Sequence, residues 1–305
     1  MVDILLATYN GEKYIREQID SILNQTYQDF RILIRDDGSK DETVSIIENY
    51  TKKYQGKIVL IQDNIECGSS VSNFMELSKH ATADYIMYCD QDDYWLPNKI
   101  ESSLNAIRKL EEKIGRDKPI LVFARYKVVD ENLKEIKNID KSNQIYKSNT
   151  NLSNLIVQNC VTGCLTIVNK RLNDMMGNYD KTILMHDWWA ALIASSMGKI
   201  VNISDVVMYY RQHGNNVVGS VDVKSFKYRI DKLFDKNTKK AKFLYRDQMI
   251  LFLNRYEKSL GDNYLVVKRF IDLFNKNKIY RMYILLKFNY LKSDIVRVIG
   301  QLLYI

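Results

Sequence analysis

The 305-residue sequence predicts an α/β protein with a mostly parallel sheet flanked by helices and a helical, basic C-terminal extension. Two observations support this prediction. Over the first 130 residues, short β-forming runs alternate with segments of helical periodicity, which is the pattern of βαβ units. The charge balance then changes, because Lys and Arg outnumber Asp and Glu by 19 to 7 over residues 224–305, against 26 to 30 before them. We therefore expect an α/β domain at 1–223 and a helical, basic extension at 224–305.

The expected elements of the first 100 residues follow from local patterns. Strands are predicted at 2–7, 30–35, 58–62 and 85–89. Ile15, Ile19 and Ile22 recur at helical spacing, which gives one apolar face of a helix between the first two strands. Ser39 or Asp41 is a candidate N-cap for a second helix, and further helices are expected at 72–80 and after Pro97.

The remaining chain predicts strands near 120–125, 165–168, 200–203 and 206–211, with an alanine-rich helix over 186–197. From Lys224 onward, helices carry both apolar and basic faces. A basic amphipathic helix suits an anionic membrane surface, and a solvated outer face of a helical cap is the alternative.

The composition excludes several classes of protein. No apolar run reaches the roughly 18 to 20 residues that a membrane-spanning helix needs. Four cysteines without a CxxC pair favour reduced thiols, and none of the three histidines stands at zinc-ligand spacing from a cysteine. The first strand begins without a basic leader before it, so we expect a cytoplasmic protein.

Polar clusters follow each of the first four strands, where open α/β sheets bind their ligands. They are residues 8–10, 36–39, 64–68 and 90–93. Each cluster alone is also consistent with a turn or a helix cap. However, Asp90, Asp92 and Asp93 repel one another, and a divalent cation with oxygen ligands removes that conflict. The resulting hypothesis is a site for a metal ion and a nucleotide. For Asp93 alone, a cap of the helix that follows Pro97 is the alternative.

Thr8-Tyr9-Asn10, Asp36-Asp37-Gly38-Ser39 and Asp90-Gln91-Asp92-Asp93, in this order, resemble the nucleotide-sugar-binding half of glycosyltransferase family 2, which has the GT-A fold. The resemblance covers residues 1–219. It implies that base and ribose are held by Thr8, Tyr9, Asn10 and Asp37, with Asp37 accepting the imide hydrogen of a pyrimidine. The Asp-x-Asp element of the family corresponds to Asp90, nearer the ribose, and Asp92, the expected ligand of Mg²⁺ or Mn²⁺.

The resemblance also implies an acceptor side in the second half. Asp187 stands where the family has its catalytic carboxylate, at the start of a helix whose N-terminus should keep it ionised as a general base. An N-cap is the alternative. Trp188 and Trp189 are expected to form a wall on which a sugar stacks. The alternative is that at least one of the two rings is buried in the core. Gly163, in a turn over 159–164, should allow backbone and acceptor sugar to approach closely; a plain β-turn is the alternative.

Residues 210–213, followed by Asn215, Asn216 and Gly219, resemble a loop of the rhamnosyltransferase-like members of this family. Arg211 is expected to bind the diphosphate through its planar guanidinium. His213 is expected to bind the metal ion or a phosphate oxygen, and a hydrogen-bonded surface histidine is the alternative.

The reaction implied is transfer of a sugar with inversion from a nucleotide diphosphate. The expected donor is dTDP-L-rhamnose, with UDP-hexoses open. The expected acceptor is a lipid-linked saccharide at the inner membrane face, in cell-surface polysaccharide synthesis.

Two other classes of protein stay open. A sugar-phosphate nucleotidyltransferase would carry a Gly-rich phosphate loop, which residues 8–13 do not clearly supply. A nucleic-acid-binding protein would explain the basic tail but not the strand-end clusters, so we expect no nucleic-acid partner.

Overall fold

The computed structural model describes residues 1–63, 65–136, 149–213, 236–293 and 295–305. Its centre is an eight-stranded sheet in the order β3-β2-β1-β4-β7-β6-β8-β5. The strands are β1 (Val2–Thr8), β2 (Phe30–Asp36), β3 (Ile58–Ile61), β4 (Tyr85–Cys89), β5 (Tyr94–Trp95), β6 (Ile120–Val129), β7 (Thr166–Asn169) and β8 (Lys199–Arg211). Four of the seven pairings between described strands are parallel, so the predicted fold class is confirmed.

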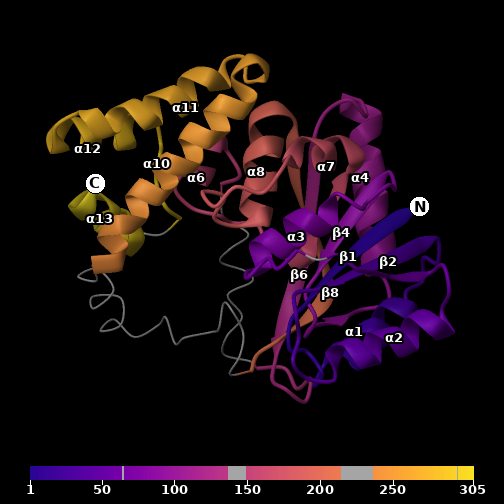
Figure 1. The fold of residues 1–305 in the computed structure, drawn as a ribbon. Helices are drawn as coiled ribbons and strands as arrows, with labels where there is room; N and C mark the ends of the chain where they lie inside the picture. The colour runs from indigo at the N-terminus through magenta and orange to yellow at the C-terminus, as the bar shows by residue number, and fades with distance from the viewer. Residues whose placement is uncertain (64, 137–148, 214–235, 294) are drawn as a thin grey trace.

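Helices cover both faces of the sheet (Figure 1). In the N-terminal half they are α1 (Ile15–Leu23), α2 (Thr43–Lys53), α3 (Ser70–Ser78) and α4 (Lys99–Ile114). After β6 come α6 (Leu152–Leu155), the 3₁₀ turn η1 (Gly163–Leu165), α7 (Lys170–Met176) and α8 (His186–Met197). The C-terminal helices are α10 (Lys236–Tyr256), η2 (Glu257–Ser259), α11 (Asn263–Asp272), η3 (Leu273–Asn275), α12 (Lys278–Lys287) and α13 (Ile295–Tyr304).

Successive side chains of β1 point to opposite faces of the sheet, which explains why the sheet has a core on each face. Ile4 and Leu6 point to the core shared with α1, α2 and α4, whereas Leu5 points to the opposite core with α3 and α8. Both sets of side chains are fully buried, as expected for a parallel strand with helices on both faces. The sheet is parallel from β3 to β4 and changes direction at β7, which pairs antiparallel with β4. The carboxyl end of β4 therefore lies at a switch in topology, where such sheets bind ligands.

Three predicted boundaries need correction. The strands expected at 200–203 and 206–211 are one strand, β8, whose pairing with β6 is irregular near Arg125. The helix expected at 72–80 is α3, which begins two residues earlier because the Ser69 side chain caps it. The N-cap position of α2 is Glu42 rather than Ser39 or Asp41, although the Asp41 carboxylate accepts a bond from the Thr43 N–H.

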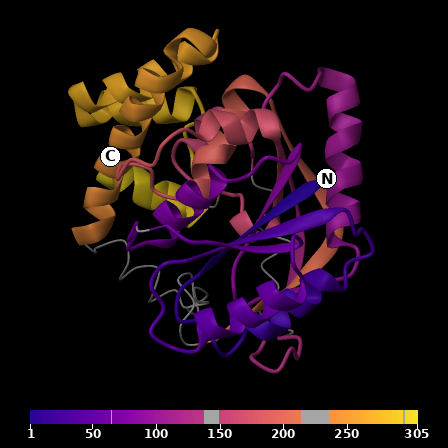
Figure 2. The same cartoon turned by 45° about the vertical axis from the view of Figure 1, so that its right-hand side comes forward.

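The C-terminal helices pack on the catalytic half through α8, which lies between them and the sheet (Figures 1 and 2). The Trp189 ring of α8 meets Phe252 and Tyr256 of α10 at centroid distances of 5.3 and 5.9 Å. These residues belong to one continuous buried cluster. The expected domain boundary at 223/224 lies outside the described residues and stays a prediction. No helix within the described ranges is both long and apolar enough to cross a bilayer.

Candidate active site

The loop after β1 is held in shape by its own polar side chains. The Thr8 hydroxyl donates to Asp36 over 2.7 Å and is buried, so its side chain stabilises the shape of the loop. Asn10 adopts a left-handed conformation with φ of 48°, and its side-chain oxygen accepts the Lys40 N–H. Tyr9, in contrast, is 54% exposed. Its backbone N–H and carbonyl both bond to the Gln91 side chain at 2.9 Å, which ties this loop to the acidic loop after β4.

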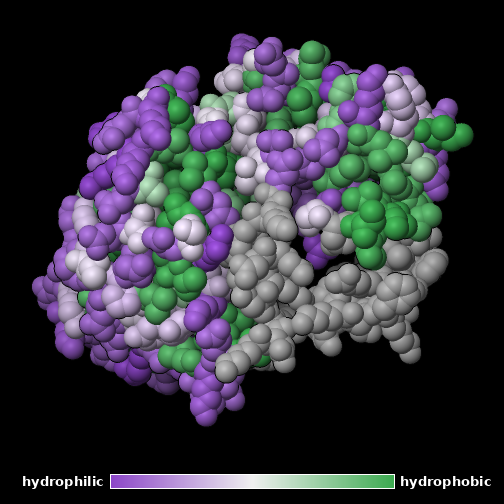
Figure 3. Space-filling view, turned by 180° about the vertical axis from the view of Figure 1, so that it is seen from behind, coloured by the Kyte–Doolittle hydropathy of each residue, from purple (hydrophilic) through white to green (hydrophobic). Residues whose placement is uncertain are grey.

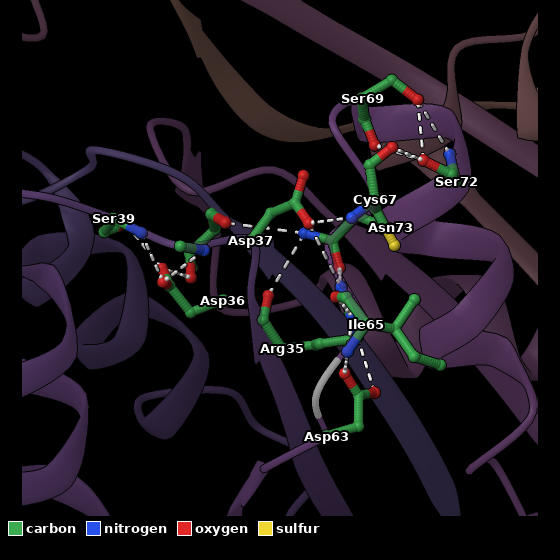
Figure 4. A network of polar contacts seen from close by, with 12 residues as sticks. Arg35, Asp36, Asp37, Ser39, Asp63, Ile65, Cys67, Ser69, Ser72 and Asn73 are labelled. Carbon is green, nitrogen blue, oxygen red and sulfur yellow. Dashed lines mark hydrogen bonds and ion pairs between the residues drawn. The ribbon is translucent and has the colours of Figure 1, made fainter.

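Asp37, at the end of β2, belongs to a buried polar network (Figure 4). Its carboxylate accepts the Cys67 N–H over 2.8 Å and lies 3.5 Å from the Arg35 guanidinium. Arg35 also donates twice to Asp63, at 2.9 and 2.7 Å, and once to Asn73. The network fixes the Asp37 carboxylate at the rim of the sheet, as a nucleobase acceptor requires.

The acidic loop 90–93 combines partly buried and fully buried carboxylates. Burial, and then the neighbouring charge of Asp92, raise the pKa of Asp90 to about 6. Asp93 is fully buried and accepts the Arg211 N–H. Its alternative role as a helix cap is wrong, because α4 begins at Lys99 with Asn98 at the N-cap position. The fully buried Lys99 ammonium lies among these groups and lowers the pKa of both carboxyls, partly offsetting burial.

Asp92 and His213 approach each other although they are far apart in sequence. The His213 Nε2 lies 2.9 Å from an Asp92 carboxylate oxygen, and the His213 ring stacks on Tyr14 at 4.8 Å. A carboxylate and an imidazole are ligands that Mn²⁺ accepts, and Mg²⁺ prefers the carboxylate. A second group, Asp90, Asp93 and Cys164, has ligand atoms within 4.8 Å of one another. Burial raises the pKa of its Cys164 thiol well above the usual value, and a protonated thiol is a poor ligand for either ion, so Asp92 and His213 fit better.

Arg211 does not have the diphosphate-binding geometry predicted for it. Its guanidinium is buried, and all three nitrogens bond to the protein. Nε donates to the Asp92 carbonyl over 2.9 Å, Nη1 to the Glu131 carbonyl over 2.6 Å and Nη2 to the Glu17 carboxylate. The planar group therefore joins the end of β8 to the acidic loop and to α1, and positions the loop that carries Asp92.

Asp187 is held at the first turn of α8 by three hydrogen bonds. One carboxylate oxygen accepts the Gly163 N–H at 2.9 Å, and the other accepts the Trp188 N–H at 2.6 Å and the Asn159 side chain at 3.1 Å. Only 6% of the residue is exposed. These bonds fix the orientation of the carboxylate.

The expectation that the helix N-terminus keeps Asp187 ionised needs correction. Burial is the largest influence and raises the pKa of Asp187 to about 7, although its hydrogen bonds lower it. Burial also lowers the pKa of the neighbouring His186 to about 3, so that its imidazole is neutral and supplies no positive charge. A carboxyl with a pKa near neutrality can accept a proton and later release it, as a general base must.

Gly163 contacts the Asp187 carboxylate and the His186 ring. It is buried, and a Cβ built on it would lie 2.6 Å from His186 Nε2 and 3.4 Å from Asp187 Cβ. The Sγ of the next residue, Cys164, lies within 4.8 Å of an Asp90 carboxylate oxygen, and the charge of Asp90 raises the pKa of Asp187 further. The segment 163–164 therefore contacts Asp187 and lies close to Asp90.

Trp188 and Trp189 do not form the predicted sugar-stacking wall. Trp188 is 7% exposed and Trp189 fully buried. The Trp188 indole donates to the Leu155 carbonyl and the Trp189 indole to the Met176 carbonyl. Both rings pack in the core because α10 covers α8, which the sequence of α8 alone does not reveal.

Sequence reasoning missed several residues that shape the site. Some could have been suspected: Arg35 is a charged residue inside an apolar strand, and such a group needs buried partners. Others carry no local signal, because their partners are far away along the chain. These are Lys99, Tyr14 and Glu17.

Comparison with known proteins identifies the family. The sequence pattern described as Glycosyl transferase family 2 matches residues 3–174, more than half of the chain. The chain belongs to glycosyl transferase family 2. Among curated members, an uncharacterized glycosyltransferase of Rickettsia prowazekii is 30% identical over 190 residues, which is 62% of this chain and 56% of the relative. The dTDP-rhamnosyl transferase RfbG of Shigella flexneri is 28% identical over 70% of this chain and 74% of its own.

Solved structures show the same fold as this family 2 chain. TarS 1–349 of S. aureus in complex with UDP superimposes with a TM-score of 0.58 at 16% identity, covering 91% of this chain and 73% of that one. The mannosyltransferase PcManGT of Pyrobaculum calidifontis, in complex with GDP-Man and Mn²⁺, has a TM-score of 0.55 at 13% identity, with 88% and 71% covered. Both are glycosyltransferases with the GT-A fold, so the expected fold is confirmed.

Proposed function

We propose that this family 2 chain is an inverting glycosyltransferase that uses a nucleotide sugar. The observation that carries the proposal is Asp187, a buried carboxyl with a pKa of about 7 that accepts the Gly163 N–H and lies near enough to Asp90 for that charge to raise its pKa. A general base works best when its pKa is near the operating pH. The membership of the chain in family 2 supports a glycosyltransferase over a nucleotidyltransferase or a nucleic-acid-binding protein.

The reaction is a single displacement at the anomeric carbon. Asp187 removes the proton from an acceptor hydroxyl, and the acceptor oxygen forms a bond to the anomeric carbon. The bond from that carbon to the diphosphate oxygen breaks on the opposite face, which inverts the configuration. Asp37 accepts the imide hydrogen of the nucleobase, and Asp90 accepts a ribose hydroxyl.

Asp92 and His213 are the residues that would hold Mg²⁺ or Mn²⁺. Such an ion neutralises the charge that develops on a departing nucleoside diphosphate. Arg211 supports this part of the site indirectly, because its guanidinium fixes the backbone of Asp92. The structural likeness to a mannosyltransferase in complex with Mn²⁺ supports the metal dependence.

The proposed donor is dTDP-L-rhamnose, supported by the similarity to RfbG over 70% of this chain. A pocket distinguishes thymine from uracil by one methyl group, worth about 1 kcal/mol. The proposed acceptor is a lipid-linked saccharide for cell-surface polysaccharide, with the protein peripheral at the inner face of the cell membrane.

The donor is tested by mass spectrometry of the nucleotide released from a panel of sugar donors with Mg²⁺ or Mn²⁺. The panel holds dTDP-L-rhamnose, UDP-glucose, UDP-N-acetylglucosamine and GDP-mannose. We expect the release of dTDP to exceed that of every other nucleotide. Faster release of UDP would overturn the proposed donor, and no release from any member with either ion would overturn the proposed activity.

A further inference from the structure

The last two helices, α12 and α13, together called the hairpin below, each carry a row of apolar side chains that the described residues leave exposed. The side chain of Lys278, at the start of α12, donates to the Leu303 carbonyl near the end of α13 over 2.9 Å, so the start of α12 lies next to the end of α13. Exposed apolar residues recur at three- and four-residue spacing along each helix: Ile279, Tyr283 and Leu286 on α12, and Ile295, Ile299 and Leu303 on α13. Ile279 is 82% exposed and Ile295 75%. A view from behind shows hydrophobic side chains gathered on this part of the molecule (Figure 3).

The charges of this hairpin are almost all positive. Residues 276–305 contain six basic residues and one acidic residue. The basic residues are Lys276, Lys278, Arg281, Lys287, Lys292 and Arg297. An amphipathic helix that binds anionic lipid headgroups presents an apolar face flanked by basic side chains, as these two helices do. A symmetric contact between two copies would place like charges opposite each other, which is unfavourable.

The hairpin turn is attached to the acceptor side of the site. The Asn154 side chain donates to the Asn289 and Leu291 carbonyls, over 3.1 and 2.8 Å. Gln158 exchanges two hydrogen bonds with Ser293, at 3.0 and 2.9 Å. The residue after Gln158 is Asn159, which donates to the Asp187 carboxylate. One short segment, 154–159, therefore contacts both the hairpin and the catalytic carboxylate.

We propose that the hairpin of α12 and α13 docks on an anionic lipid bilayer and holds the acceptor side of the site at the membrane surface. The apolar faces enter the boundary between headgroups and acyl chains, and the basic side chains lie among the lipid phosphates. The statement that docking holds the acceptor side at the membrane rests on the proposed transfer to a lipid-linked acceptor. The docking itself depends only on the hairpin.

Flotation of the full chain with vesicles tests the docking without donor or acceptor. We expect binding to vesicles that contain phosphatidylglycerol, weaker binding to pure phosphatidylcholine, and a decrease with added salt. The double variant Ile279→Glu/Ile299→Glu should lower the partition coefficient by about tenfold or more, since both side chains are exposed and their replacement leaves the core intact. Ile65→Glu, at a residue that is 51% exposed beside β3, is the matched control and should bind as the unchanged chain does.

Two results would overturn the docking. One is equal vesicle binding by the double variant and the unchanged chain. The other is a stable dimer, measured by light scattering, that the double variant dissociates. Donor hydrolysis is measured in parallel and separates docking from the proposed transfer. If the double variant hydrolyses the donor but no longer binds vesicles, docking is supported. If neither the unchanged chain nor any variant hydrolyses the donor, the proposed transfer is rejected and docking is unaffected.

Discussion

The backbone N–H of Gly163 donates a hydrogen bond to the Asp187 carboxylate over 2.9 Å, within a space that leaves no room for a side chain. The Sγ of the next residue, Cys164, lies within 4.8 Å of an Asp90 carboxylate oxygen. Two carboxylates that are far apart in sequence therefore lie around one short turn.

Replacement of this glycine should therefore impair catalysis. A Cβ at Gly163 would meet His186 Nε2 at 2.6 Å, and His186 is buried between Phe74 and Tyr88, so the turn must shift. We expect Gly163→Ala to lower kcat by about 10²-fold, since a displacement of about 1 Å at the reacting groups has that effect. Thr162→Ala, one residue earlier, is the control and should keep kcat within about threefold in the same assay. Equal kcat values for both variants would contradict the role of Gly163.

The pH dependence of transfer should report Asp187. Burial raises its pKa to about 7, and only the ionised carboxylate accepts a proton. We therefore expect kcat/KM to fall about tenfold per pH unit below pH 7 and to level off above it. The profile is measured at constant ionic strength with saturating Mg²⁺. A profile that stays flat down to pH 5 would be inconsistent with a base of this pKa.

The proposed metal ligands should act together. His213 Nε2 and the Asp92 carboxylate lie 2.9 Å apart, so loss of either removes part of one site. We expect His213→Ala to weaken Mn²⁺-dependent binding of dTDP in calorimetric titrations by about tenfold to 100-fold. The variant Asp117→Ala, at an exposed carboxylate, should bind as the unchanged protein does. Unchanged metal-dependent affinity in His213→Ala would exclude this histidine as a ligand.

Arg211→Lys distinguishes a structural from a diphosphate-binding role. Lysine cannot reproduce the three bonds to Asp92, Glu131 and Glu17, so the structure predicts a loss of about 2–4 kcal/mol in the free energy of unfolding. Urea denaturation without ligands measures this directly. An unfolding free energy within about 0.5 kcal/mol of the unchanged protein, together with weaker donor binding, would restore the role predicted from the sequence.

The sequence predicted which residues the candidate site brings together because its elements are local. Parallel strands end at the same edge of a sheet, so the polar residues after β1, β2 and β4 had to lie together there. The position of Asp187 at the start of α8 followed equally from a clear apolar helix. These predictions needed only the order of the strands and the spacing at which apolar residues recur in each segment.

The roles of Arg211 and of the two tryptophans could not be predicted in the same way. The guanidinium of Arg211 is surrounded by partners 80 to 194 positions away in sequence, and nothing near residue 211 indicates them. Trp189 is covered by Phe252 and Tyr256 of a helix whose packing partner the periodicity does not reveal. The pKa of Asp187 likewise depends on burial by the whole fold.

Single-turnover kinetics of Asp187→Asn with bound donor test the central claim most directly. Asparagine keeps the shape of the side chain but cannot accept the acceptor proton. We expect the rate of sugar transfer to fall by about 10²- to 10⁴-fold, with donor affinity unchanged within about threefold. Transfer at nearly the rate of the unchanged protein would contradict the assignment of Asp187 as the general base.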